Sequence, residues 1–150
     1  MKLKIPPLVV TFIFGLFMYL LATYLPVGYF DFFGRYYLMY VLLFLAFLIG
    51  VVSLVQFFSS KTSVDPRTPS KVSKLVTGGL YQYSRNPMYL ALLLLLLSWG
   101  LYLGNAFNTL LAAGFVYYMN TFQIMPEEEA LASMFGKEYQ KYCVMVRRWF

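Results

Sequence analysis

An uncharged run of 41 residues, positions 86 to 126, constrains the fold of this chain more than any other feature. It begins directly after Arg85 and ends directly before Glu127, Glu128 and Glu129. About 20 apolar residues cross the hydrocarbon core of a bilayer, so this run is too long for one helical span and long enough for two. Two antiparallel spans return the chain to the face it left, and we expect Arg85 to approach the acidic residues there.

A turn is expected near the middle of this run. Its turn-forming residues are Gly100, Gly104 and Asn105. Glycine and asparagine favour turns, so we expect one helix over about residues 88–103 and another over about residues 107–125. Pro87 fits the first turn of the earlier helix, where a missing amide hydrogen costs no hydrogen bond.

Two more apolar runs come before a polar segment. Residues 8–25 and residues 36–58 are both uncharged, and the first run follows Lys2 and Lys4. We interpret the first run as a membrane anchor rather than a cleaved signal peptide, because it is long and no small-residue cleavage site follows it. We expect the two runs to form a helical hairpin, and residues 59–77, rich in Ser, Thr, Pro and Lys, to form a loop.

The last segment, residues 127–150, has a helical pattern. Its apolar positions recur every three, four or seven residues, and its charged residues lie off that stripe. The stripe consists of Leu131, Phe135, Tyr142, Val146 and Trp149. We expect one amphipathic helix that lies along the membrane surface or folds back against the bundle.

The composition is typical of a membrane protein and restricts the chemistry. Hydrophobic residues make up 61% of the chain and charged residues 12%, against about a quarter charged in soluble domains. With one cysteine and no histidine there is no ligand set for zinc, so we expect no metal. The net charge of +6 lies at the ends of apolar runs, so we expect no nucleic-acid partner.

Lysine and arginine positions predict the orientation. Two precede residue 8, five lie between Ser59 and Pro87, four follow Pro126, and one, Arg35, lies elsewhere. By the positive-inside rule, both termini and the polar clusters face the cytoplasm, and we expect the membrane to be the cell inner membrane.

These patterns predict an all-α integral membrane protein with one domain, residues 1–150. It has about four transmembrane helices and a C-terminal amphipathic cytoplasmic helix. The parts are a transmembrane hairpin (1–58), a cytoplasmic loop (59–77) and a core (78–150).

Arg85, Glu127 and Glu128 are candidate ligand-binding residues. A cation and carboxylates at the end of a helical bundle can bind a ligand that carries groups of both signs. In the alternative interpretation, Arg85 only anchors a helix at the membrane and the glutamates only complement a helix N-terminus. The uncharged runs lack the buried ionisable groups that proton-coupled transporters use, which disfavours transport.

Nearby polar and aromatic residues also have two interpretations. Tyr81, Tyr83 and Tyr89 can stack on a flat ring or belong to the interfacial belt of aromatic residues. Asn120 and Gln123 can extend the same pocket or join helices by hydrogen bonds.

The second half of the chain also carries an ordered series of motifs. The series is Gly79-Leu80-Tyr81-x-Tyr83-x-Arg85-Asn86-Pro87-x-Tyr89, then Asn105, then Glu127-Glu128, then Phe135-Gly136-Lys137-Glu138-Tyr139-x-x-Tyr142. In this order and spacing, it resembles the isoprenylcysteine carboxyl methyltransferase family and its small bacterial relatives. Phospholipid N-methyltransferases share the broader plan. The resemblance covers about residues 75–150.

The resemblance implies an integral membrane methyltransferase that binds S-adenosylmethionine in a cytosol-facing pocket of the core. It also implies a lipophilic or membrane-associated acceptor, with a carboxylate, thiol or amine, that reaches the pocket from the bilayer lipids. Arg85 and Glu128 are the implied catalytic pair. The implied cofactor-binding residues are Tyr81, Arg85, Asn86, Pro87, Tyr89, Glu127 and Glu128.

Asn86 departs from the family pattern, which usually has a histidine between the arginine and the proline. An amide donates and accepts hydrogen bonds but does not titrate near neutral pH, so this position supplies no base. The alternative function is therefore a non-catalytic membrane scaffold or binding protein that keeps the methyltransferase fold. The basic and aromatic tail, residues 146–150, either closes the pocket or holds substrate, as the resemblance implies, or anchors the chain at the membrane surface.

Overall fold

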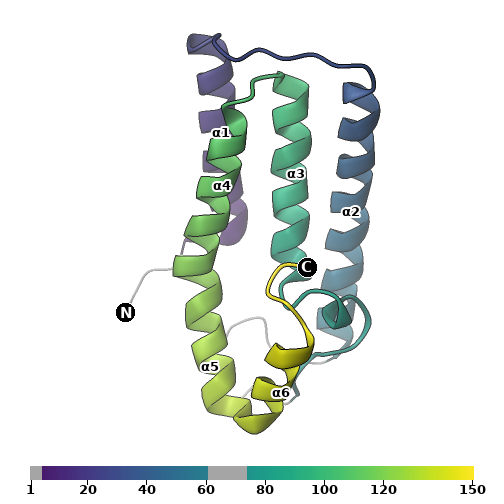
Figure 1. Cartoon of the computed structure of the whole chain (residues 1–150). Coiled ribbons are helices and arrows are strands. Elements are labelled where there is room, and N and C mark those ends of the chain that lie inside the picture. Colours follow the sequence, from purple (N-terminus) through teal and green to yellow (C-terminus); the bar gives the residue numbers. More distant parts are fainter. Residues whose placement is uncertain (1–4, 61–73) are drawn as a thin grey trace.

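The structure consists of a helical bundle with a smaller helical layer at one end (Figure 1). It is a computed structural model that describes residues 5–60 and 74–150. The elements in chain order are α1 (Pro7–Tyr24), α2 (Arg35–Ser59), η2 (Gly79–Gln82), α3 (Pro87–Leu103), α4 (Asn108–Met119), η3 (Asn120–Ile124), α5 (Met125–Phe135) and α6 (Lys137–Met145). Over these residues the expectation of an all-helical fold is confirmed. Most of the expected polar loop, residues 61–73, lies outside the described residues.

The first two helices follow the apolar runs of the sequence closely. α1 has 18 residues and begins at a proline, and α2 has 25 residues. Both are long and apolar enough to cross a membrane, since about 20 residues span the hydrocarbon core. α3 is also apolar but has 17 residues. Length and composition therefore give two candidate spans in the part of the chain that the structure describes.

α3 lies between α1 and α2, so the expected hairpin of the first two helices is wrong in its packing (Figure 1). α2 packs along α3, where Gly50 lies against Ala91 and the Ser98 hydroxyl donates a hydrogen bond to the Met39 carbonyl (2.9 Å). Small residues at such a contact let helix backbones approach closely. The connection over residues 25–34 crosses the end of the bundle and leaves room for α3 between its neighbours.

Large apolar side chains fill the space between α1, α3 and α4. Phe115 of α4 packs edge-on against Phe14 of α1, with ring centroids 5.7 Å apart. The Trp99 indole N–H donates a hydrogen bond to the Gly15 carbonyl (3.1 Å) and joins α3 to α1. The buried members of this core are Val10, Met18, Leu96, Phe115, Met119 and Ile124.

The helix that begins with α4 continues past the uncharged run, residues 86–126, and into the acidic residues. η3 is a π-helical turn, in which the Met125 N–H bonds to the Asn120 carbonyl five residues back, and α5 follows it directly. Pro126 has no amide hydrogen and its ring crowds the preceding turn, and we attribute the wider π turn to this crowding. Glu127 and Glu128 are consequently carried in the first turn of α5.

Gly136 ends α5, so the expectation of one amphipathic helix over residues 127–150 is wrong. Its φ of +48° lies in a region that favours glycine, because a Cβ would be strained there. α6 begins at the next residue and turns back toward the bundle (Figure 1), and extended geometry at Val146 ends it. The periodic apolar positions are therefore divided between two helices and a returning tail.

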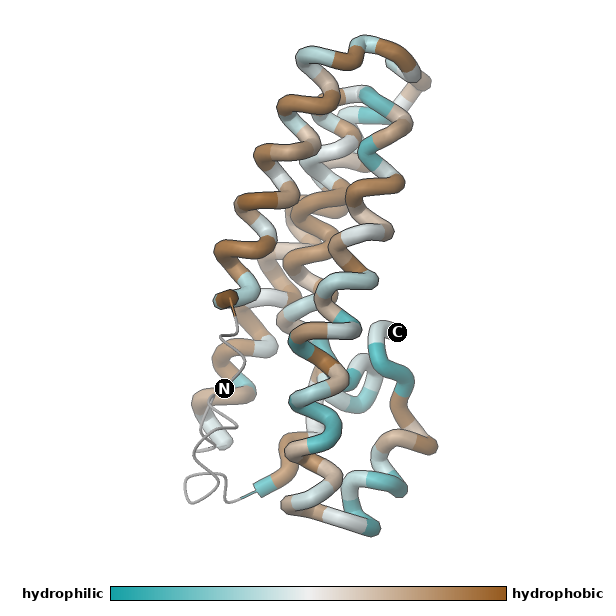
Figure 2. Tube along the Cα trace, turned by 90° about the vertical axis from the view of Figure 1, so that its left-hand side faces the viewer, coloured by the Kyte–Doolittle hydropathy of each residue, from teal (hydrophilic) through white to brown (hydrophobic). Residues whose placement is uncertain are grey.

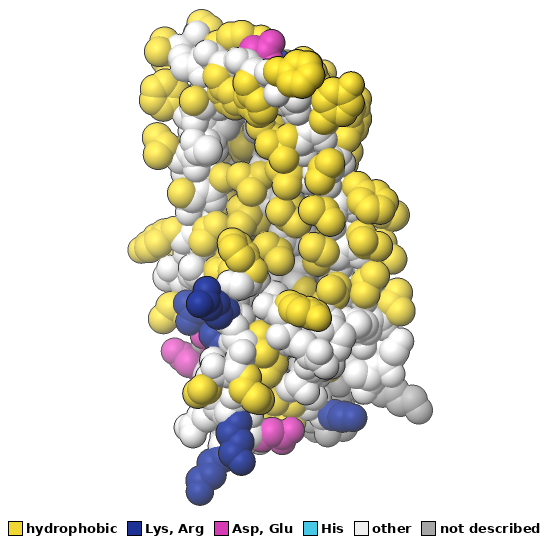
Figure 3. Space-filling model, turned by 45° about the vertical axis from the view of Figure 1, so that its right-hand side comes forward, with side chains coloured by type: hydrophobic (Ala, Val, Ile, Leu, Met, Phe, Trp, Pro, Cys, Tyr) yellow, Lys and Arg dark blue, Asp and Glu magenta, His cyan; other side chains and the backbone are white. Residues whose placement is uncertain are grey.

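The outer surface is apolar along the bundle and polar at the end formed by α5 and α6 (Figures 2 and 3). Phe12 of α1 and Phe47 of α2 expose 78% and 72% of their surface. Apolar side chains that point outward along whole helices favour contact with lipid rather than water.

Candidate cofactor site

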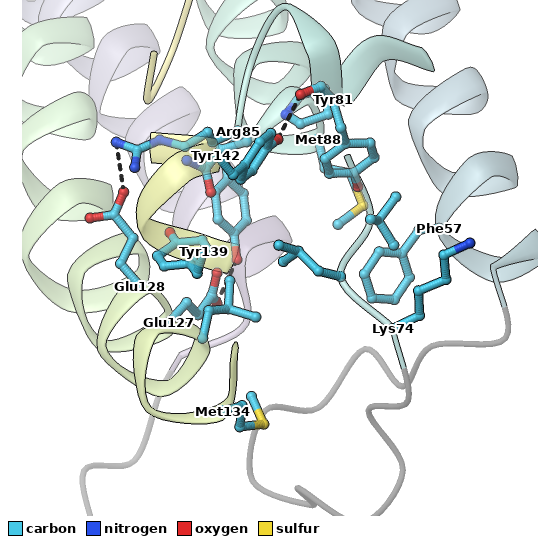
Figure 4. A pocket seen from close by; sticks show the side chains of 16 residues that line it. Phe57, Lys74, Tyr81, Arg85, Met88, Glu127, Glu128, Met134, Tyr139 and Tyr142 are labelled. Atoms are coloured by element: carbon cyan, nitrogen blue, oxygen red, sulfur yellow. Dashed lines mark hydrogen bonds and ion pairs between the residues drawn. The ribbon is translucent and has the colours of Figure 1, made fainter. Parts of the chain in front are cut away.

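The polar end of the bundle holds a cavity of about 160 Å³ that is open on one side (Figure 4). It lies between the end of α2, the segment that precedes α3, and helices α5 and α6. The structure brings together here all seven residues implied as cofactor-binding: Tyr81, Arg85, Asn86, Pro87, Tyr89, Glu127 and Glu128. The other lining residues are Phe57, Lys74, Leu75, Val76, Met88, Leu131, Met134, Tyr139 and Tyr142.

The start of α3 positions Arg85 and Asn86. Pro87 is the first residue of α3, and a proline disfavours helical geometry in the residue before it. Asn86 accordingly has non-helical backbone angles (φ −131°, ψ 58°), and its backbone N–H donates to the Ser84 hydroxyl oxygen (3.1 Å). Arg85 and Asn86 therefore lie just before the first turn of the helix, and both line the cavity.

Glu128 lies between two arginines. Arg85 Nη2 is 3.2 Å from Glu128 Oε1, and Arg148 binds the same carboxylate through Nε (3.1 Å) and Nη2 (2.7 Å). The hydrogen bond to Glu128 raises the pKa of Arg148. The Arg85 and Glu128 side chains are only 13% and 18% exposed, so water screens their attraction weakly. Two guanidinium groups and one carboxylate leave an excess positive charge, which suits an anionic group of a ligand.

Arg85 also has hydrogen-bonding capacity to spare. One of its terminal nitrogens contacts the Cys143 sulfur of α6. Its Nε is buried and has no hydrogen-bond partner among the described residues. A buried donor without a partner is costly, and a ligand that accepts this hydrogen bond would remove the cost.

Glu127 faces α3 rather than the arginines. The Tyr89 hydroxyl donates a hydrogen bond to Glu127 Oε1 (2.8 Å), which joins the first turn of α5 to the first turn of α3. The second carboxylate of the cavity is thus held by an aromatic hydroxyl from a helix 38 residues earlier in the chain.

Three tyrosines form an aromatic part of the wall. The Tyr142 hydroxyl donates a hydrogen bond to the Tyr81 carbonyl (2.6 Å), so α6 fixes the backbone of η2. Burial raises the pKa of Tyr81 to about 12, and it raises the pKa values of Tyr139 and Tyr142 as well. The Tyr81 hydroxyl is buried without a hydrogen-bond partner in the described part of the chain. At neutral pH it is a protonated donor available to a ligand.

The remaining wall is mostly apolar, and Lys74 also lines it beside Phe57. Phe57, Met88 and Met134 lie on the side of the cavity away from the Arg85–Glu128 pair (Figure 4). The cavity thus offers a charged end, aromatic faces and an apolar side. Such a set suits an organic ligand with charged groups and a flat ring. In residues 5–60 and 74–150, no group of three or more His, Cys, Asp or Glu side chains could hold a metal ion.

A second cavity, the groove between α1 and α3, lies on the apolar body of the bundle. Its volume is about 460 Å³, and its walls come from α1 and α3. Its lining residues are Leu8, Thr11, Phe12, Gly15, Leu16, Tyr19, Leu95, Leu96 and Trp99. The Thr11 hydroxyl donates a hydrogen bond to a backbone carbonyl of its own helix, and the Trp99 N–H donates one to the Gly15 carbonyl. Both polar groups thus already have hydrogen-bond partners, so an apolar occupant would leave neither of them unpaired.

Four residues weighed from the sequence lie outside the cavity. Tyr83 is 75% exposed and does not line it. Asn105 lies at the other end of the bundle and bonds two backbone groups of the turns there. Asn120 accepts a hydrogen bond from an indole of the C-terminal tail, and Gln123 donates one to the chain just before α1 (2.6 Å). The last two therefore join segments of the chain.

The sequence did not single out Tyr139, Tyr142 or Arg148 as site residues. The two tyrosines belong to the motif series quoted above, and that membership was the available sign of a role. Arg148 belongs to the tail that the resemblance implies closes the pocket or holds substrate, but its approach to Glu128 was not predicted, because it depends on the break at Gly136 and the return of α6.

A model of the phospholipid methyltransferase family matches residues 35–138 of the chain. These residues include the segment before α3 and the two cavity glutamates, Glu127 and Glu128, and they end just before the cavity tyrosines of α6, Tyr139 and Tyr142.

Two relatives extend this comparison. An uncharacterized protein of Haemophilus influenzae is 52% identical over 62 residues, which are 41% of this chain and 98% of that protein. The protein-S-isoprenylcysteine O-methyltransferase of Schizosaccharomyces pombe is 32% identical over 90 residues, which are 60% of this chain. The match spans 38% of the length of the yeast enzyme. No solved structure matches the chain significantly.

Proposed function

Because the chain belongs to the phospholipid methyltransferase family, we propose that it transfers a methyl group from S-adenosylmethionine to a small lipophilic or membrane-associated acceptor. The observation that carries the proposal is the cavity between α3, α5 and α6. Seven residues from two segments about 40 residues apart line this cavity, and they supply a cation, two carboxylates and aromatic faces.

The residues of the cavity fit the groups of this cofactor. Arg85 suits the methionine carboxylate, and its buried Nε lacks a partner among the described residues. Glu127 and Glu128 suit the methionine ammonium or the ribose hydroxyls, and Tyr81 suits the adenine face. The enclosed volume of about 160 Å³ holds only part of so large a molecule, so the rest lies at the open side of the cavity.

The chemistry requires positioning more than acid or base catalysis. When bound, S-adenosylmethionine would supply a methyl group on a positively charged sulfur: a lone pair of the acceptor would bond to the methyl carbon as the carbon–sulfur bond breaks, and S-adenosylhomocysteine would leave. Arg85 and Glu128 hold the donor, and the apolar wall excludes water. Asn86 cannot act as a base, so a carboxylate or thiolate acceptor fits the site better than a protonated amine, which another group would have to deprotonate.

The acceptor is proposed to come from the bilayer. The groove between α1 and α3 has almost entirely apolar walls, and the outward faces of both helices suit lipid. These features support a lipophilic acceptor whose apolar part lies among the helices.

The proposed membrane arrangement has four spans, with both termini and the cavity on the cytoplasmic side of the cell inner membrane. α1 and α2 are long enough on their own. The other two spans would be α3 and the continuous helix formed by α4 and η3. These helices lie within the uncharged run between Arg85 and Glu127. The excess of lysine and arginine at the cavity end supports this orientation.

Methyl transfer tests the proposal. Purified protein in lipid is given S-adenosylmethionine with a radioactive methyl group and a set of lipophilic carboxylates, thiols and amines, and label in the organic extract is counted. Wild type is expected to label one class. Glu128→Gln removes a charge that two arginines share and is expected to lower the rate about tenfold or more. The matched control, Glu129→Gln, alters an exposed glutamate outside the cavity and is expected to keep the rate.

Two outcomes would contradict the proposal. Equal rates in the Glu128 and Glu129 variants would show that the cavity is not the site of transfer. Cofactor binding without transfer to any of the three acceptor classes would favour the alternative, a membrane binding protein that keeps the fold.

A further inference from the structure

The last residues of the chain return to the segment that precedes α3. The Arg85 N–H donates a hydrogen bond to the Arg147 carbonyl (3.0 Å). The Asn86 side-chain Nδ2 donates one to the Arg148 carbonyl, also at 3.0 Å. The tail, residues 146–150, thus runs beside Arg85 and Asn86 although more than 60 residues separate them in sequence (Figure 1).

Two side chains of the tail extend this attachment. Arg148 binds both oxygens of Glu128, at 3.1 and 2.7 Å. The Trp149 N–H donates to the Asn120 side-chain oxygen (3.0 Å), and its ring packs against the core between α1, α3 and α4. The tail is therefore held from Asn86 on one side and from the π turn on the other.

We propose that Asn86 is a positioning residue, which holds the tail so that Arg148 orients Glu128 for the cofactor. This inference rests on the proposed function. The bond from Asn86 fixes the backbone of Arg148, and the paired bonds from Arg148 then fix the plane of the carboxylate. Arg85 is less occupied by Glu128, with one contact at 3.2 Å, and keeps donors for the ligand.

The role requires a hydrogen-bond donor at position 86 and not a base. An amide supplies the donor, and a ring N–H of histidine can supply it too, whereas a carboxylate of the same shape cannot and would face the Arg148 carbonyl with like polarity. The asparagine of this chain is thus compatible with an intact site.

Fluorescence of the tail gives a readout that does not need the cofactor. The chain has two tryptophans, so Trp99→Phe leaves Trp149 as the one indole. In this background, Asn86→Asp is expected to release the tail and shift the Trp149 emission to longer wavelength. Asn86→His is expected to restore the wild-type emission. Gln82→Glu makes the same chemical change at an exposed residue four positions earlier and is expected to leave the emission unchanged.

Cofactor affinity is then measured on the same variants with Trp99 restored. Asn86→Asp is expected to weaken S-adenosylmethionine binding about tenfold, Asn86→His to recover most of it, and Gln82→Glu to have no effect. Helix content by circular dichroism is expected to stay constant in all three. Hydrogen exchange of residues 146–150 in the wild-type background gives the tail readout if Trp99→Phe folds poorly.

The inference and the proposed function fail in different ways. Unchanged tail signals in Asn86→Asp would overturn the inference, and so would a released tail with unchanged cofactor affinity. Wild-type protein that binds no S-adenosylmethionine would instead overturn the proposed function, while the tail readout would still test whether Asn86 holds the tail.

Discussion

The hydroxyl of Tyr81 is a specific feature that supports the proposed ligand site in the cavity. Tyr81 is 7% exposed, and its Oη has no hydrogen-bond partner among the described residues. Its backbone carbonyl accepts a hydrogen bond from the Tyr142 hydroxyl, which holds the segment that carries the ring. A buried polar group without a partner costs about 1–3 kcal/mol, and stable proteins contain few of them.

Replacement of Tyr81 by phenylalanine separates stability from binding. Tyr81→Phe removes the buried hydroxyl and breaks no bond seen in the described structure, so the ligand-free protein is expected to be as thermally stable as wild type or more so. Its affinity for S-adenosylmethionine is expected to fall about fivefold to tenfold. Thermal unfolding in detergent and titration calorimetry check the two effects. Tyr83→Phe, at an exposed tyrosine outside the cavity, is the control and should change neither.

Among single residues, the sequence predicted that Arg85 lies near Glu127 and Glu128, but it did not single out Tyr139 and Tyr142 of α6 or Arg148 of the tail. Arg85 and Glu128 could be brought together by counting spans, because two antiparallel helices return to one face. Arg148 could not, since its position depends on the break at Gly136, the return of α6 and the extended geometry at Val146. The sequence indicated only that Asn86 replaces a possible base. The structure shows that its side-chain amide donates a hydrogen bond to the Arg148 carbonyl.

For the helices, the apolar runs predicted where each helix lies in the sequence, but they did not predict which helices pack against each other. The bounds of α2 and α3 differ from the predicted runs by about a residue. The insertion of α3 between α1 and α2 depends on small contacts such as Gly50 against Ala91, which periodicity alone does not reveal. Likewise, the π turn before Pro126 carries α4 into α5 without the break that the composition suggested.

The proposed placement of α6 and of the α1–α2 connection on opposite membrane faces can be tested by labelling. In a Cys143→Ser background, Val144→Cys places a thiol on α6 at a residue that is 88% exposed, and Phe33→Cys places one at a fully exposed residue of the connection. In intact cells, a membrane-impermeant maleimide is expected to label position 33 and to label position 144 only after permeabilisation. The reverse pattern would show the opposite orientation, and labelling of both in intact cells would contradict a spanning bundle.

In the molecule as a whole, the apolar body and the polar end differ in the surroundings and the ligands that they suit. The body suits the bilayer and contains the groove between α1 and α3, while the polar end gathers charges from segments far apart in sequence (Figures 2 and 3). The family match spans both parts. A soluble donor and a lipophilic acceptor would thus meet where the two parts join.

Titration calorimetry of S-adenosylmethionine and S-adenosylhomocysteine into the purified protein tests whether the cavity is the cofactor site. Wild type is expected to bind both at micromolar affinity. Arg85→Ala is expected to weaken binding by about tenfold or more, because it removes the cation proposed for the methionine carboxylate. Lys141→Ala removes an exposed cation of α6 outside the cavity and is expected to bind as wild type does. The cavity would not be the cofactor site if folded wild-type protein bound neither ligand, or if the Arg85→Ala variant bound as tightly as wild type.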